Sequence, residues 1–317
     1  MVQVFRAIAI IAVVMIHTTP EGEWQVFCRP FINFSVATFL FLSGYLTKVE
    51  NNNWTFLCKK RIFRVIIPYF IWTILYSWPT IKHNGIESLI VNLITAKASV
   101  PLYYIFVYIQ FILLTPLLVR LAKSKYKFIG WLIAPISILI FKYYYLFTGI
   151  EISRPVYLFW SNACLGWFTF YYLGLLLGNN IIRISYSLKS LTFLYIASLF
   201  IQIAEGYIWF SYGEQNCGTQ LKLSSLLTSS LFLLCIYTIL KNGEFNIKSK
   251  FLISLGNYSF GIYLCHMMII KYSRFIPFYY HMPFPINSAI IILISLGCCI
   301  IGYEILGKRI GGWIGLR

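Results

Sequence analysis

Apolar runs long enough to cross a lipid bilayer recur along the whole of this chain. A spanning helix needs about 20 mostly apolar residues, and inside hydrocarbon a helix satisfies its own backbone hydrogen bonds. We therefore expect an all-α polytopic transmembrane helical bundle of about ten helices. The predicted spans are residues 2–19, 27–47, 62–80, 101–120, 128–148, 156–178, 190–210, 222–240, 251–270 and 286–306.

Composition supports a membrane protein with one domain. Hydrophobic residues make up 59% of the chain and charged residues only 11%, whereas soluble domains carry about 25% charged residues. A β-barrel would show short alternating segments, and the uniformly apolar run AIAIIAVVMI (7–16) does not fit them. The loops are short, so we expect residues 1–317 to form a single membrane domain with no appended soluble domain.

The charge distribution predicts an orientation. The chain has 26 Lys and Arg against 9 Asp and Glu, a net charge of +17. If the N-terminus is cytoplasmic, 17 of the cations fall in cytoplasmic loops and the C-terminal tail, and 8 fall on the opposite side. The positive-inside rule then predicts that both termini are cytoplasmic. The excess of basic residues follows from this orientation, and we expect no nucleic-acid partner.

The first predicted span contains two side chains that are costly to bury. In FRAIAIIAVVMIHT (5–18), Arg6 and His17 lie eleven positions apart, which places them on one helix face about 16 Å apart along the axis. Arg6 could snorkel to the cytoplasmic surface. His17 is either an interior hydrogen-bonding group or a general base, because imidazole titrates close to neutral pH.

Further motifs follow this pair in order along the chain. They read TFLFLSGYL (38–46), KKRIFRVIIPYFIW (59–72), FYYLGLLLG (170–178) and LGNYSFGIYLCH (255–266). Together with Arg-x₁₀-His they resemble, over essentially the whole chain, the acyltransferase-3 family of integral membrane acyltransferases, including polysaccharide O-acetyltransferases.

The resemblance implies an activity and a location. Such an enzyme moves an acetyl or other acyl group from cytoplasmic acetyl-CoA, the acyl-donor co-substrate, to a hydroxyl of a lipid-linked or cell-surface glycan. It would lie in the bacterial cytoplasmic (inner) membrane among lipids, with possible polysaccharide-assembly proteins as partners. We expect no metal, since the eight cysteines include no C-x-x-C pair of the kind that binds zinc. An acetyl-enzyme at His17 and direct transfer are both open.

The motifs also imply site residues. The resemblance makes His17 the general base and Arg6 a second catalytic residue. Arg61 and Arg64 are three positions apart and share a helix face, so they could form a fork for CoA phosphates, or simply provide positive-inside charge. The other implied positions are Lys60 and Ser43 for the donor and His266 and Tyr263 for the acceptor; Lys60 could also be topological charge, and His266 a structural hydrogen-bonding residue. Outside the motifs, Glu205 and Glu151 are weaker candidates for contacts with sugar hydroxyls.

The sequence leaves several alternatives open. Ser43 and Gly44 could mark a close helix contact or a substrate site. Segments such as PLYYIFVY (101–108) form either an interfacial aromatic belt or a sugar cleft. The family often has Asp three residues before the first-helix arginine; here that position is Gln3, and the chain has no Asp. The alternatives to an enzyme are a transporter or flippase for a glycolipid or small solute, and a membrane scaffold.

Overall fold

The structure is a computed structural model that describes residues 1–50, 53–150, 153–213, 217–243 and 247–317. Across these ranges the chain forms helices and no β-strand. The α-helices are α1 (Val2–Thr18), α2 (Glu23–Cys28), α3 (Phe34–Tyr45), α4 (Trp54–Thr95), α5 (Tyr103–Lys123), α6 (Gly130–Ile138), α7 (Tyr144–Thr148), α8 (Arg154–Asn162), α9 (Phe168–Gly178), α10 (Leu188–Ser211), α11 (Leu223–Asn242), α12 (Lys250–Asn257), α13 (Ser259–Ser273), α14 (Pro277–Tyr280) and α15 (Ile286–Trp313).

These helices form the predicted kind of bundle. Seven helical stretches in the described chain are long and apolar enough to cross a membrane, and the bent pair α12–α13 makes an eighth. Two further apolar helices, Val2–Thr18 and Leu165–Gly178, are shorter than the length that counts as a candidate span, so the structure has seven to eight such spans where the sequence predicts about ten. Each of the ten predicted spans overlaps one of these elements. The prediction of an all-α polytopic bundle is confirmed, and the chain is a multi-pass membrane protein.

The predicted span 156–178 is not one continuous helix. It divides into α8, a short 3₁₀ turn (Leu165–Trp167) and α9. The side chain of Gln110 on α5 bridges the break: its Nε2 donates to the Asn162 carbonyl (2.7 Å), and its Oε1 accepts from the Cys164 N–H (3.0 Å). A helix break at membrane depth is tolerated where other protein groups satisfy the freed backbone.

A second break falls inside the last sequence motif. Helices α12 and α13 meet at Tyr258 with a bend of 77°. Gly256 permits this arrangement, because a Cβ there would overlap the Gln3 carbonyl of α1. Gly256, Asn257 and Ser259, at this bend, line a cavity.

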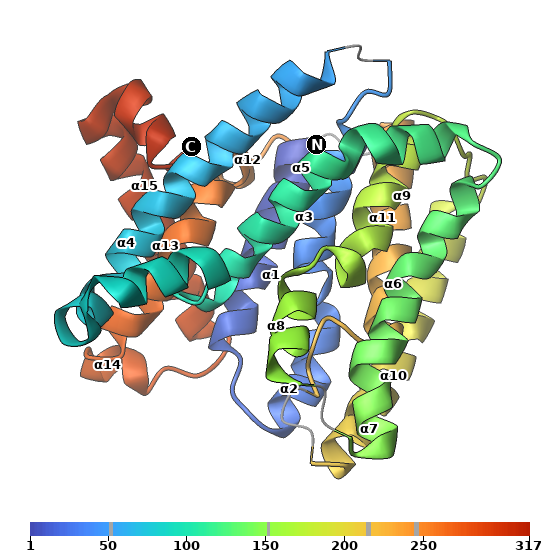
Figure 1. The fold of residues 1–317 in the computed structure, drawn as a ribbon. Helices are drawn as coiled ribbons and strands as arrows, with labels where there is room; N and C mark the ends of the chain where they lie inside the picture. Colours follow the sequence, from blue (N-terminus) through green and yellow to red (C-terminus); the bar gives the residue numbers. More distant parts are fainter. Residues whose placement is uncertain (51–52, 151–152, 214–216, 244–246) are drawn as a thin grey trace.

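Helix α1 runs through the middle of the bundle, where α3, α12, α13 and α15 pack against it (Figure 1). The N- and C-termini lie near the same end of the molecule in Figure 1. Contacts agree with this placement. The guanidinium of Arg317 lies over the rings of Tyr258 and Tyr303, next to the α12–α13 bend that touches the start of α1.

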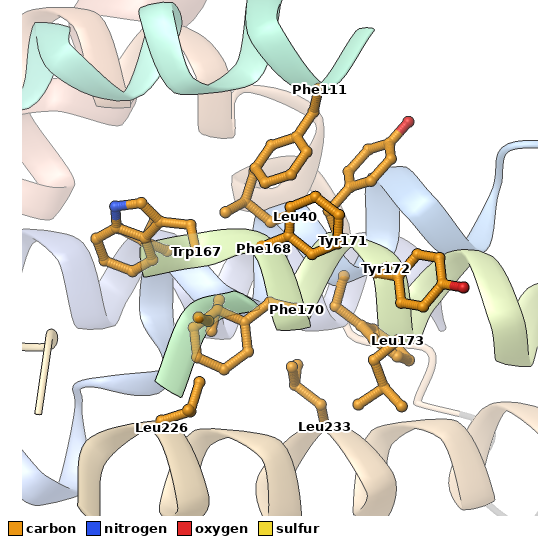
Figure 2. Packing of buried hydrophobic residues seen from close by; sticks show 14 of the residues in the cluster. Leu40, Phe111, Trp167, Phe168, Phe170, Tyr171, Tyr172, Leu173, Leu226 and Leu233 are labelled. Atoms are coloured by element: carbon orange, nitrogen blue, oxygen red, sulfur yellow. The ribbon is translucent and has the colours of Figure 1, made fainter. Parts of the chain in front are cut away.

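Helices α3 and α9 make the most extensive helix contact in the described part of the chain. Added Cβ atoms at Gly44, Gly174 and Gly178 would overlap the carbonyls of the facing helix, as is typical of small residues at membrane helix interfaces. Around this contact, aromatic and leucine side chains of α9 pack between α5 and α11 (Figure 2). The FYYLGLLLG motif therefore builds the core.

Substituting Gly174 tests this contact. We expect Gly174→Ala to lower the melting temperature of the detergent-solubilised protein, because overpacking typically costs about 1–3 kcal/mol. Gly297→Ala on α15 is the matched control: nothing lies within 4 Å of its Cβ, so the helix propensity of alanine should leave stability unchanged or raise it slightly. Equal melting temperatures for the two variants would contradict the close contact.

Candidate active site

Helix α1 carries one basic side chain towards each end, and each lines a different cavity. Arg6 lines a cavity of about 560 Å³, which we call the Arg6 cavity. His17, at the other end of the helix, lines a cavity of about 450 Å³, which we call the His17 cavity. The spacing of the two residues along α1 thus separates them into two compartments.

The Arg6 cavity is strongly basic. Four arginines line it, drawn from α1, α4 and the C-terminal residues, and no Asp or Glu is among its described lining residues. Arg61 donates from Nη1 to the Thr47 hydroxyl (2.9 Å), which fixes its direction. The arginines are Arg6, Arg61, Arg64 and Arg317.

Most residues expected at the donor site lie together in the Arg6 cavity. Ser43 lines it and hydrogen-bonds the Tyr108 hydroxyl (3.2 Å), while its neighbour Gly44 faces away and packs on α9. Arg61 and Arg64 line the same space. Lys60 is exposed and is not part of the lining.

His17 and His266 face one another across the contact between α1 and α13. Their ring centroids are 5.3 Å apart with the planes tilted by 44°. His266 is fully buried, and its Nδ1 lies 3.0 Å from the Ile262 carbonyl. A carbonyl only accepts, so Nδ1 carries the hydrogen and Nε2 is the basic nitrogen. That Nε2 atom is buried without a hydrogen-bond partner.

The lining of the His17 cavity is polar and, unlike that of the Arg6 cavity, is not dominated by arginines. Amide, hydroxyl and cationic side chains surround it, and two tryptophans add flat apolar surface. Its polar side chains include Gln25, Arg29, Ser35, Lys142, Asn162 and Gln220. Such a mixture of ring surface and hydrogen-bonding groups suits a small polar ligand.

Tyr263 lines both cavities. Its buried hydroxyl donates to the Pro101 carbonyl, and the ring of Tyr104 meets its ring edge-on at 5.5 Å between centroids. Tyr104 belongs to the Arg6 cavity, whereas Pro101 and Tyr103 belong to the His17 cavity. Tyr263 is therefore the partition between the two compartments, and the PLYYIFVY segment contributes to both.

Glu205 lines neither cavity. Its carboxylate accepts hydrogen bonds from the hydroxyls of Tyr143 and Ser224 and from the Ser224 N–H. Lys222 is buried close to this network and donates to the Cys217 carbonyl (2.6 Å). The network thus holds the segment 217–222, part of which lines the His17 cavity. Glu151 lies outside the described residues.

Sequence reasoning missed several lining residues. For Arg29 and Arg317 the sequence indicates only topological charge, because nothing in their local sequence distinguishes them from other loop cations, yet both line a cavity. Asn162 enters the cavity wall at the α8–α9 break, which hydropathy does not reveal. Across the described ranges, no group of three or more His, Cys, Asp or Glu side chains could hold a metal ion.

The fold and these cavities define a polytopic membrane protein with a buried, two-sided polar site. A family model described as an acyltransferase domain matches residues 2–304, nearly the whole chain. The chain belongs to the acyltransferase-3 family and is a membrane acyltransferase. Comparison with curated proteins and with solved structures found no significant match.

Substituting Glu205 separates a structural from a substrate-binding role. We expect Glu205→Gln to lower the melting temperature, since an amide cannot accept all the hydrogen bonds that the carboxylate receives and unsatisfied buried groups cost about 1–3 kcal/mol each. Glu87→Gln, on an exposed part of α4, should leave it unchanged. An unchanged melting temperature for Glu205→Gln, together with a raised KM for the acceptor, would support the predicted substrate contact instead.

Proposed function

We propose that this acyltransferase moves an acetyl group from acetyl-CoA to a hydroxyl of a lipid-linked or cell-surface glycan, in the cytoplasmic membrane of a bacterium. Family membership supports the acyl transfer. Two cavities at opposite ends of α1 support the proposed donor and acceptor. The cavity at one end is basic, the cavity at the other end is polar, and Tyr263 lines both. This arrangement suits a reaction whose donor and acceptor arrive from opposite sides.

The Arg6 cavity is the proposed donor site. Clustered guanidinium groups bind phosphates bidentately, and CoA is rich in phosphate. Arg61 and Arg64 lie on one helix, and Arg317 approaches from the C-terminal residues. The chain termini lie at this end of α1, so the predicted cytoplasmic placement of the termini would bring cytoplasmic acetyl-CoA to this cavity.

The His17 cavity is the proposed acceptor site. A sugar ring can stack on the lining aromatic side chains and hydrogen-bond to the amides. His17 is positioned beside this space and would take the proton from the reacting hydroxyl. His266 is a positioning residue in this proposal, because its ring packs behind that of His17.

The proposed reaction follows from these positions. The sugar oxygen attacks the thioester carbonyl carbon while its proton moves to His17; the carbon–sulfur bond then breaks, and the CoA thiolate receives the proton. Arg6 lines the donor cavity together with Tyr263 and, within the described residues, makes no ion pair or hydrogen bond. Because Arg6 and His17 lie about 16 Å apart along the helix axis, the charge of Arg6 would act on the CoA part of the donor and not on the carbonyl that faces His17.

Removal of His17 tests the proposed base. We expect His17→Ala to lower acetyl transfer from labelled acetyl-CoA to a lipid-linked oligosaccharide by about 10²–10⁴-fold, the typical contribution of general base catalysis. His83→Ala, an exposed histidine on α4 that lines neither cavity, is the matched control and should retain full activity. Melting temperatures of both variants should match that of the wild-type protein.

Two outcomes would contradict this assignment. Undiminished transfer by His17→Ala would exclude His17 as the base. Saturable uptake of a glycolipid or solute into liposomes, without acetylation of any glycan tested, would instead favour a transporter whose pathway uses the same cavities.

A further inference from the structure

Among the described residues, the lining of the His17 cavity contains two cationic side chains and no carboxylate. These cations are Arg29, from the turn after α2, and Lys142, from the π-helical turn after α6. The positive-inside rule explains cations on the other side of the bundle but not these two.

Arg29 is the more informative of the two. Its aliphatic stem packs against Gly218, where an added Cβ would press on the Arg29 Cγ and on Gln25. Its Nε atom is buried without a hydrogen-bond partner, and within the described part of the chain no carboxylate pairs with its guanidinium. Lys222, also buried, differs because it donates to the Cys217 carbonyl.

A cation held inside a membrane protein without a counter-charge is costly. The cost falls when an anionic ligand occupies the same space, since charge-assisted hydrogen bonds between guanidinium and carboxylate or phosphate are among the strongest in proteins. The cavity volume of about 450 Å³ lies within the range of small-molecule sites, roughly 300–1,000 Å³, so there is room for a charged sugar residue.

We propose that the His17 cavity binds an acceptor carrying an anionic group, which Arg29 binds directly and Lys142 attracts, while His17 faces the hydroxyl to be acylated. This inference rests on the proposed function and narrows its acceptor to an acidic glycan. The anionic group is an oxyanion from one of two sources: the carboxylate of an acidic sugar or the phosphate of a phosphorylated sugar.

A competition assay with the full chain in lipid nanodiscs tests the proposal. The purified protein receives labelled acetyl-CoA and equal concentrations of methyl glucuronide, glucose 1-phosphate and methyl glucoside, and mass spectrometry quantifies each acetylated product. We expect a charged acceptor to exceed the neutral one by about tenfold to a hundredfold, the range for hydrogen bonds to charged groups. The preferred charged probe identifies carboxylate or phosphate as the source.

Substitutions at Arg29 show whether that preference depends on the guanidinium. Arg29→Gln should bring the ratio of charged to neutral product close to one, mainly through a higher KM for the charged acceptor. Arg29→Lys should keep part of the preference. Lys82→Gln, an exposed lysine on α4 outside the cavity, is the control and should leave the ratio unchanged.

Thermal stabilisation by the same three compounds, without acetyl-CoA, separates this inference from the proposed reaction. A charged compound should raise the melting temperature of the wild-type protein but not that of Arg29→Gln. If it does so while no compound is acetylated, the anion site stands and the proposed reaction fails. Equal acetylation of charged and neutral acceptors, no thermal shift with either charged compound, or an unchanged preference in Arg29→Gln would overturn the anion site.

Discussion

The structure depends on how polar side chains inside a membrane bundle are accommodated. A basic group surrounded by hydrocarbon is costly, so α1 could not hold Arg6 and His17 if apolar helices enclosed it on all sides. The surrounding helices avoid this cost by breaking. The α8–α9 break adds Asn162 to the wall beside His17, and the α12–α13 bend brings Asn257 to the cavity beside Arg6.

These breaks are possible because rigid contacts hold the rest of the bundle. The glycine contact between α3 and α9 holds two helices close together, and the aromatic core around it leaves little room for adjustment. Gln110 then satisfies the backbone of the α8–α9 break from a third helix. Close packing thus keeps the helices in place, and hydrogen bonds to the freed backbone groups allow a helix to break.

Tyr263 connects the two halves of the proposed mechanism. A partition made of a tyrosine ring separates the basic compartment from the polar one while both remain in contact with the same side chain. In the proposal, the donor phosphates and the acceptor sugar need different surroundings, and this partition gives each its own cavity. His17 lies on the side of the proposed acceptor cavity, with His266 packed against it.

Much of the bundle could be predicted from the sequence, because hydropathy depends on local composition. The Arg6–His17 spacing and the motif at Tyr263 also pointed to residues that line the cavities. The helix breaks could not be predicted in the same way: the Gln110 bridge joins α5 to residues more than fifty positions away. Only the fold shows that Arg29 and Arg317 line the cavities. Lys60, which the sequence predicts at the donor site, lies outside both cavities.

The central claim is that donor and acceptor enter from opposite ends of α1. Proteoliposomes that hold the protein in one orientation test this claim. Acetyl-CoA and an acceptor glycan are supplied on chosen sides of the membrane, and the glycan chosen is one that the enzyme acetylates in detergent. We expect product when acetyl-CoA is on the side of the chain termini and the glycan is on the other. Product only when both are on the same side would contradict transfer between the two cavities.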